Sequence, residues 1–181
     1  MRPFTVHTTI SAPPEAVFDF VGDLANGPAW TGHLAEDYRL ARAKSAGLGA
    51  GARFRTNPPG PHVWVEIANA EYERPRRIVQ KGRHGRVGRS ASEAVFEFKP
   101  DSGGTRVELT MWTEPGHRWD AVKEKLGARR WLSREARIML KRLRGVFEDP
   151  PDGELARASV AGYETATAAR FGDHPDLHTA G

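Results

Sequence analysis

Residues 4–24, FTVHTTISAPPEAVFDFVGDL, change from one hydrophobic period to another within a few positions. Alternate residues from Phe4 to Ile10 are apolar or β-branched, which is typical of a half-buried β-strand. Two prolines then suit a first helical turn, and apolar residues from Val17 onward recur at helical spacing. The segment therefore predicts a strand followed directly by an amphipathic helix, with Ser11 as the N-cap.

The middle of the chain predicts further strands, because apolar residues alternate between turns rich in glycine and proline. Asn26-Gly27-Pro28 ends the first helix, and Trp30 follows in a short, broken second helical segment. Successive strands joined by short turns indicate an antiparallel meander. We expect six more strands, over residues 38–43, 52–56, 62–72, 76–82, 92–99 and 105–113.

The last ordered element is predicted to be a long helix, from Asp120 to Phe147. Its apolar residues recur three and four positions apart and form one stripe, namely Leu132, Ala136, Met139, Leu140, Leu143 and Phe147. Such a helix is the natural cover for the apolar face of a twisted antiparallel sheet. We therefore expect one α+β domain over residues 1–148.

Residues 149–181 differ in composition from the rest of the chain. They begin with Asp149-Pro150-Pro151, contain few large apolar residues, and carry two basic and six acidic groups. We expect them to form an acidic, Pro- and Ala-rich, disordered tail. Because the whole chain has a net charge of +4 and this tail one of −4, residues 1–148 carry +8. A basic domain raises the question of an anionic partner.

The composition excludes several classes of protein. No cysteine occurs among the 181 residues, which removes disulfides and thiolate chemistry and fits a cytoplasmic location. No window is apolar enough to span a bilayer, and no signal-peptide region precedes the first strand. The seven histidines show no paired spacing typical of metal ligands, so we expect neither a metal nor another cofactor. No phosphate-binding glycine loop or nucleophile motif occurs in the required context.

Several short motifs follow one another in a characteristic order. They are Ile10-x-Ala12-Pro13-x-Glu15-x-Val17-Phe18, Trp30, Glu73-Arg74-Pro75-Arg76-Arg77-Ile78, and Phe96-x-Phe98 before Gly104-Thr105-x-Val107. Together with the C-terminal amphipathic helix, they resemble the START-like, helix-grip superfamily over about residues 3–148. This superfamily includes polyketide cyclase/dehydrase-type proteins and the Bet v 1 allergens. The resemblance implies a curved antiparallel sheet of about seven strands around the long helix, with two short helices after the first strand.

The same resemblance implies a cavity between the sheet and the long helix. Members of the superfamily hold lipids, sterols, polyketides, hormones or quinones there, and only some of them are enzymes. We therefore expect binding of a small hydrophobic molecule, aromatic, polyketide-like or lipid-like. A cyclase/dehydratase-type lyase or isomerase activity stays open, because the chain offers no residue-for-residue match to a catalytic set. The expected ligand-binding residues are Trp30, His33, Phe54, Tyr72, Phe96, Phe98, Met111, Leu132 and Met139.

Acid–base chemistry would need a titratable side chain that faces this cavity. Glu66, Glu93, Glu108 and His7 alternate out of phase with the apolar residues of their strands, so we expect them on the solvated outer face. His33 lies near Trp30 and the expected mouth of the cavity, and it is the candidate group. The alternative for His33 is an ordinary loop histidine, and each aromatic residue could equally fill the core.

The basic stretch from Arg74 to Arg89 supports a different class of function. Its cationic side chains could contact the phosphates of RNA, a ribosome or another anionic partner. No aromatic residue lies between them to stack on bases, so a solvated hairpin is the simpler interpretation. The alternative predicts a closed, well-packed interior. We expect a monomer or homodimer whose partner is a small hydrophobic molecule rather than nucleic acid.

Overall fold

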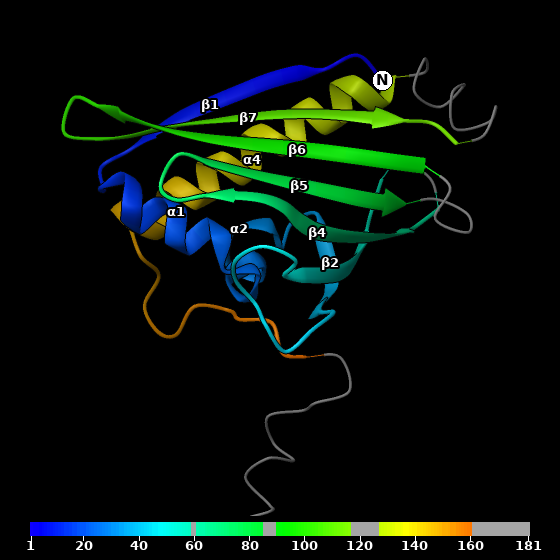
Figure 1. Ribbon diagram of the computed structural model, residues 1–181, viewed down its shortest axis with the longest axis horizontal. Coiled ribbons are helices and arrows are strands. Elements are labelled where there is room, and N and C mark those ends of the chain that lie inside the picture. The colour runs from blue at the N-terminus through cyan, green and yellow to red at the C-terminus, as the bar shows by residue number, and fades with distance from the viewer. Residues whose placement is uncertain (59–60, 85–89, 117–126, 161–181) are drawn as a thin grey trace, which may run out of the picture.

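Seven antiparallel strands form a curved sheet in the order β1-β7-β6-β5-β4-β3-β2 (Figure 1). The computed structural model describes residues 1–58, 61–84, 90–116 and 127–160. The predicted meander is confirmed, and the bounds of its strands shift by only a few residues. The strands are β1 (Phe4–Ile10), β2 (Ala35–Leu40), β3 (Gly51–Thr56), β4 (Val63–Glu73), β5 (Arg77–His84), β6 (Ser90–Asp101) and β7 (Gly104–Glu114).

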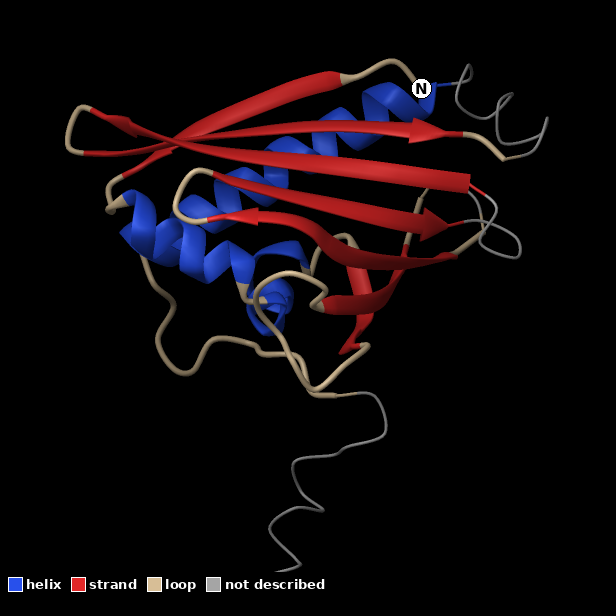
Figure 2. Cartoon of the chain, viewed as in Figure 1, coloured by secondary structure: helices blue, strands red, loops and turns tan. Residues whose placement is uncertain are grey.

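The helices lie on one side of this sheet, as Figure 2 shows. α1 (Pro14–Gly22), η1 (Leu24–Asn26) and α2 (Gly27–Thr31) carry the chain from β1 at one edge to β2 at the other. α4 (Arg129–Glu148) runs diagonally behind the sheet and packs against β1 and α2. The predicted long helix is thus confirmed, although its expected start at Asp120 lies outside the described residues. In the described part of the chain, no helix is long and apolar enough to cross a membrane.

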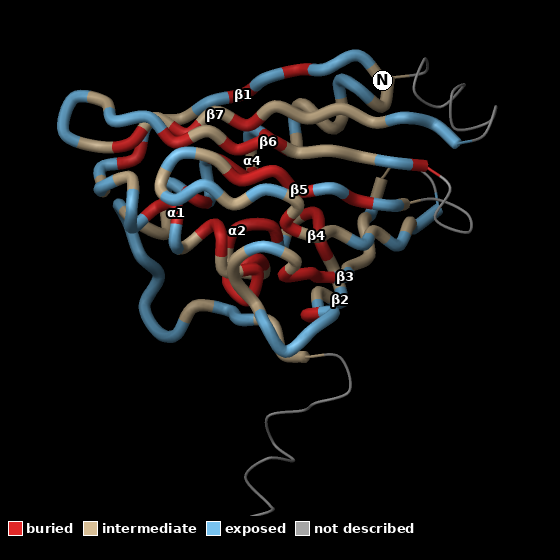
Figure 3. Tube along the Cα trace, in the orientation of Figure 1, coloured by how far each residue is buried: buried red, intermediate tan, exposed pale blue. Residues whose placement is uncertain are grey.

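The core lies between the helices and the concave face of the sheet, where the buried segments in Figure 3 gather. Phe18 of α1 is fully buried and meets the rings of Tyr72 and Phe98 edge-on, at centroid distances of 4.8 and 5.3 Å. These aromatic contacts close the end of the molecule next to α1. The fully or largely buried residues of the α4 stripe are Ala136, Met139, Leu140 and Leu143.

The predicted cap of α1 is wrong. The residue at the N-cap position is Pro13, with extended backbone, and it offers no side-chain hydrogen bond. Ser11 lies too far before the helix to cap it. Its backbone N–H and its hydroxyl both donate to Glu148 Oε1 instead, at 3.1 and 3.0 Å. The serine therefore ties the corner between β1 and α1 to the C-terminal end of α4.

A buried amide links four parts of the chain near the centre of β4. Asn69 is only 1% exposed, and its Nδ2 lies 3.4 Å from the carbonyl oxygen of Gly22 and 3.2 Å from that of Gly47. Its Oδ1 accepts a hydrogen bond from Gln80 Nε2 at 3.3 Å. The pairing of β4 with β5 shifts between Asn69 and Glu71. Asn69 thus joins the end of α1, the loop before β3, and β5.

The chain returns to the domain after α4. Arg157 donates to Asn26 Oδ1 at 2.6 Å and to Asp23 Oδ2 at 2.8 Å, and Val160 forms a parallel bridge with Leu40. We call residues 157–160 the C-terminal strap. Burial opposes ionisation of Asp23, but hydrogen bonds from Ser45, the backbone of Ala25 and Arg157 hold the pKa of its carboxyl below the ordinary value.

The strap differs from the disordered tail expected for residues 149–181. These residues return to the domain because Ala158 and Val160 pack against a small second cluster of buried apolar residues at the edge strand β2. Arg157 fixes the strap there through two acceptors more than a hundred positions earlier in the chain. Residues 161–181, the rest of the expected tail, lie outside the described residues.

We predict that Asn69→Ala lowers the free energy of unfolding by about 2–3 kcal/mol, because two buried carbonyls and the Gln80 amide lose their partner. Urea denaturation measures this change. Asn57→Ala is the matched control, because Asn57 is exposed. Equal stability of the two variants would contradict the central role of the Asn69 amide.

The strap generates a pH-dependent prediction. The pKa of Asp23 is below its unfolded value of 3.8, so its stabilising contribution is present above that pH and is lost as the pH falls through the folded value. Arg157→Ala should therefore cost about 1 kcal/mol at pH 7 and clearly less at pH 3. Thermal unfolding at both pH values tests this, with the exposed Glu154→Ala as control. A cost that does not change with pH would show that Asp23 is not involved.

Candidate ligand-binding cavity

A cavity of about 610 Å³ lies between the concave face of the sheet and the helices. Its floor consists of inward-facing residues of β4 to β7. Its other walls come from α2, β2, β3, the segment after β3 and the first turns of α4. A volume of this size is typical of sites for small organic ligands. Most of the lining side chains are aliphatic or aromatic.

The cavity exists because three neighbouring floor positions carry very small residues. Gly82 is paired with Ser92 in the register of β5 and β6, and Ala94 is paired with Gln80 one row deeper. A Cβ atom on Gly82 would lie 2.5 Å from the Ser92 hydroxyl oxygen. With so little side-chain volume at this place, the helices above the sheet cannot fill the space.

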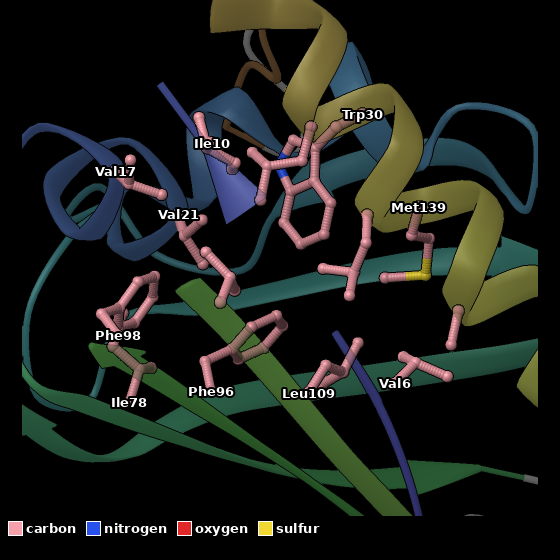
Figure 4. Close-up of a cluster of buried hydrophobic side chains, with 14 of the residues drawn as sticks. Val6, Ile10, Val17, Val21, Trp30, Ile78, Phe96, Phe98, Leu109 and Met139 are labelled. Atoms are coloured by element: carbon pink, nitrogen blue, oxygen red, sulfur yellow. The ribbon is translucent and has the colours of Figure 1, made fainter. Parts of the chain in front are cut away.

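Large apolar side chains form the deep wall of the cavity. Trp30 of α2 is 5% exposed and meets Phe96 of β6 edge-on at a centroid distance of 6.0 Å. Figure 4 shows Trp30 and Met139 extending from the two helices toward Phe96 and Leu109 on the sheet. The buried indole Nε1 of Trp30 has no hydrogen-bond partner among the described residues. Apart from this N–H group, Trp30, Phe96 and Met139 offer a ligand apolar contact.

A stacked aromatic pair forms another wall. The rings of Tyr38 and Phe54 are parallel within 1°, with centroids 5.2 Å apart. Tyr38 fits because Gly27 has no side chain, since a Cβ there would lie 2.4 Å from the tyrosine ring. Burial raises the pKa of the Tyr38 hydroxyl, and the negative charge of Asp23 raises it further. The phenol is therefore protonated at neutral pH and can donate a hydrogen bond.

The structure brings most of the expected ligand-binding residues together on the cavity wall. They are Trp30, Phe54, Phe96, Met111, Leu132 and Met139. Trp30 was expected beside the mouth and instead lies deep in the wall. His33, Tyr72 and Phe98 do not line the cavity. Phe98 lies beyond Phe96 along β6, where α1 covers the sheet, and the Tyr72 ring packs on Gly22 and Phe18.

His33 connects α2 to α4. Its Nε2 lies 3.4 Å from the backbone oxygen of Glu135 and 3.5 Å from Glu135 Oε2. Burial lowers the pKa of His33, and the positive charge of Arg142 acts in the same direction, against the opposing effect of Glu135. Its buried Nδ1 has no partner among the described residues. His33 is therefore a neutral interhelical contact at pH 7, away from the cavity.

The strand carboxylates expected on the outer face do lie there. Glu108 binds Lys99 and Arg106, at 2.6 and 2.9 Å, and Glu66 lies 3.7 Å from Arg53. His7, on β1, is exposed. Glu93 is paired in register with Lys81 and Trp112, in the outward row, although it also lies among the residues that border the cavity.

Sequence reasoning missed several wall residues. Tyr38 was passed over because β2 alternates only weakly, and the small floor residues carry no recognisable signal. Gln80 could have been found, because it shares the inward phase of β5 with the buried Ile78. Among the described residues, no group of three or more histidines and carboxylates is arranged to hold a metal ion.

Comparisons with known proteins agree with this geometry. The family model described as "Polyketide cyclase / dehydrase and lipid transport" matches residues 1–148. No curated protein matches the chain. Similar solved structures include protein TTHA0849 from Thermus thermophilus, at 23% identity and a TM-score of 0.59, covering 79% of this chain and 94% of that one.

Two more solved structures show the same fold. Protein CV1439 from Chromobacterium violaceum is 18% identical, with a TM-score of 0.59, and the match covers 84% of this chain and all of that one. Ara h 8.0201 is 12% identical, with a TM-score of 0.55, over 81% of this chain and 97% of that one. At these identities the likeness concerns the fold alone.

The His33 contact predicts a loss of stability in mild acid. Because the folded pKa lies below the unfolded value of 6.5, the unfolded state binds more protons between the two values, and stability falls as the pH drops below about 6.5. We expect His33→Asn to flatten this part of the profile. Urea denaturation at a series of pH values from 7.5 to 5 measures it, with the exposed His7→Asn as control. An unchanged profile in His33→Asn would contradict the assignment.

Proposed function

The chain belongs to the polyketide cyclase / dehydrase and lipid transport family, and on this basis we propose that its cavity binds a small aromatic, polyketide-like or lipid-like molecule. The observation that carries the proposal is the cavity of about 610 Å³ with a predominantly apolar wall. A folded domain normally fills its interior to the density of an organic crystal. A space of this size therefore indicates an occupant.

The wall favours a hydrophobic occupant on energetic grounds. Each 100 Å² of apolar ligand surface removed from water contributes about 2.5 kcal/mol. The deep wall of Trp30, Phe96 and Met139 offers apolar contact area, and its one polar atom is the unpaired indole N–H of Trp30. The stacked rings of Tyr38 and Phe54 offer aromatic surface that a ligand ring can contact.

We favour binding over catalysis for this cavity. An enzyme of the cyclase/dehydratase type would orient its substrate and move a proton with a suitably tuned side chain. Among the lining residues, the Tyr38 phenol has a raised pKa, so at neutral pH it can donate a hydrogen bond but is a poor proton donor. The other titratable side chains of the described lining are His84 and Glu93, and Glu93 lies in the outward row of β6. His33, the expected acid–base candidate, lies outside the wall.

The alternative, docking of RNA or another anionic partner on the basic hairpin, has less support. Arg74 binds Asp19 through two hydrogen bonds of 2.7 Å, and Arg77 lies 3.2 Å from Glu71 and 3.8 Å from Glu97. These acidic neighbours neutralise the charges of Arg74 and Arg77, and Arg86 and Arg89 lie outside the described residues. The alternative also predicts a closed interior, in contrast to the large cavity.

The proposed function is tested by filling the cavity. Ala94 lies on the floor and Ala91 lies on the outer face of the same strand, where it is exposed. We expect Ala94→Phe to lose at least tenfold in affinity for an uncharged hydrophobic fluorescent probe such as N-phenyl-1-naphthylamine, because the new ring occupies the site. Ala91→Phe should bind as the wild type does.

Native mass spectrometry of the freshly purified proteins adds a second measurement. The wild type and Ala91→Phe should retain a stoichiometric apolar molecule that Ala94→Phe lacks. Thermal unfolding of both variants checks that they are folded. No retained molecule, together with no thermal shift across aromatic polyketides, lipids and quinones, would refute the proposed function.

A further inference from the structure

The floor of the cavity changes in polarity along the strands. The register aligns Phe96 of β6 with Leu109 of β7 in the deepest row. The next row contains Gln80 and Ala94, and the row after that contains Gly82 and Ser92. The floor is therefore apolar at its deep end, and its hydrogen-bonding side chains begin at Gln80.

The orientation of the Gln80 amide follows from its neighbours. The side-chain amide of Asn69 faces two carbonyl oxygens, those of Gly22 and Gly47, and only its NH₂ group can donate to them. Its Oδ1 must then accept, and the group that donates to it is Gln80 Nε2, at 3.3 Å. Gln80 Oε1 is the atom that remains for the cavity. A buried carbonyl oxygen accepts hydrogen bonds and cannot donate one.

Ser92 lies diagonally across from Gln80 on the neighbouring strand. Its hydroxyl oxygen occupies the space above Gly82. A ligand hydroxyl near these two residues could donate to Gln80 Oε1 and accept from the Ser92 hydroxyl, whereas an ether or ketone would leave the Gln80 oxygen unpaired. An unpaired buried acceptor costs binding free energy.

The charges around the cavity argue against an ionised ligand. Among the described lining residues there is no lysine or arginine, and the N-terminal ammonium of Met1 already donates to the carbonyl oxygen of Thr113. A carboxylate placed beside Gln80 Oε1 would lose its hydration and face another acceptor oxygen, with no described lysine or arginine in the lining to pair with it.

We propose that the cavity selects an uncharged apolar molecule with a hydroxyl group, an alcohol or phenol, whose hydroxyl donates to Gln80 Oε1 while its apolar body points toward Phe96 and Leu109. This inference rests on the proposed function and specifies the chemistry of the ligand. Gln80 is then the residue that determines specificity.

The test compares three probes of similar shape by calorimetry at pH 7. They are 2-naphthol, 2-methoxynaphthalene, which accepts but does not donate, and 2-naphthoate, which is ionised. We expect 2-naphthol to bind the wild type roughly tenfold more tightly than 2-methoxynaphthalene, and 2-naphthoate to bind most weakly.

Gln80→Met removes the acceptor oxygen and replaces the amide side chain with an apolar one of similar length. The ratio of the naphthol and methoxynaphthalene affinities should fall to about one, and a purely structural role for Gln80 would leave this ratio unchanged. Thr110→Val is the control, because the Thr110 hydroxyl lies outside the cavity and pairs with Thr5 Oγ1 at 2.8 Å. Its ratio should equal that of the wild type.

The outcomes separate the two proposals. If 2-naphthol and 2-methoxynaphthalene bind the wild type equally, or if 2-naphthoate binds best, the cavity binds hydrophobic molecules but the inference about the hydroxyl is wrong. If none of the probes binds and Ala94→Phe behaves like the wild type, the proposed function fails and this inference with it. The wild-type comparison stands even if Gln80→Met does not fold.

Discussion

The side-chain amide of Asn69 forms hydrogen bonds to separate parts of the fold through its NH₂ group and its oxygen. Its NH₂ group meets carbonyl oxygens at the end of α1 and in the loop before β3, while its oxygen accepts from β5. A buried polar group is stabilising only when its partners are present, so these segments must assemble together. The same arrangement turns the oxygen of Gln80 toward the cavity. One structural amide thus determines both how the chain closes and which polar atom a ligand meets.

The cavity is a compromise between packing and space. At the end next to α1, Phe18, Tyr72 and Phe98 fill the concave face completely. Farther along the same strands, the small residues Gly82, Ser92 and Ala94 of the floor face the cavity, whose opposite wall includes Leu132 and Met139 of α4. An unfilled interior forgoes dispersion contacts and hydrophobic stabilisation. The stability lost at the cavity is offset by the dense aromatic packing at the end next to α1.

The spacing of apolar residues and the order of the segments predicted the fold. Alternation in Phe4–Ile10 and the helical stripe of α4 can each be recognised within a single segment. The cavity wall was predicted less completely, because it depends on which residues of different strands share a row. That register is altered by the shift between Asn69 and Glu71 in β4. Ser92, for example, is recognised as a wall residue only once its pairing with Gly82 places it next to Gln80. The strap escaped prediction because its partners, Asp23 and Asn26, are distant in the chain and can be identified only once the fold is formed.

Many basic side chains of the domain lie on the outer face of the sheet. On the outer face, Arg77 and Lys99 alternate with Glu71, Glu97 and Glu108 in a continuous series of ion pairs across β4 to β7. Exposed pairs of this kind contribute little stability each, but they hold charge where water can solvate it. The cavity wall excludes lysine and arginine among its described residues. A carboxylate in the cavity would therefore lose its hydration without a lysine or arginine to pair with, at a cost of several kcal/mol. Selection against charge comes from the whole wall, whereas selection for a hydroxyl needs only the orientation of one amide, so the two kinds of specificity can change independently.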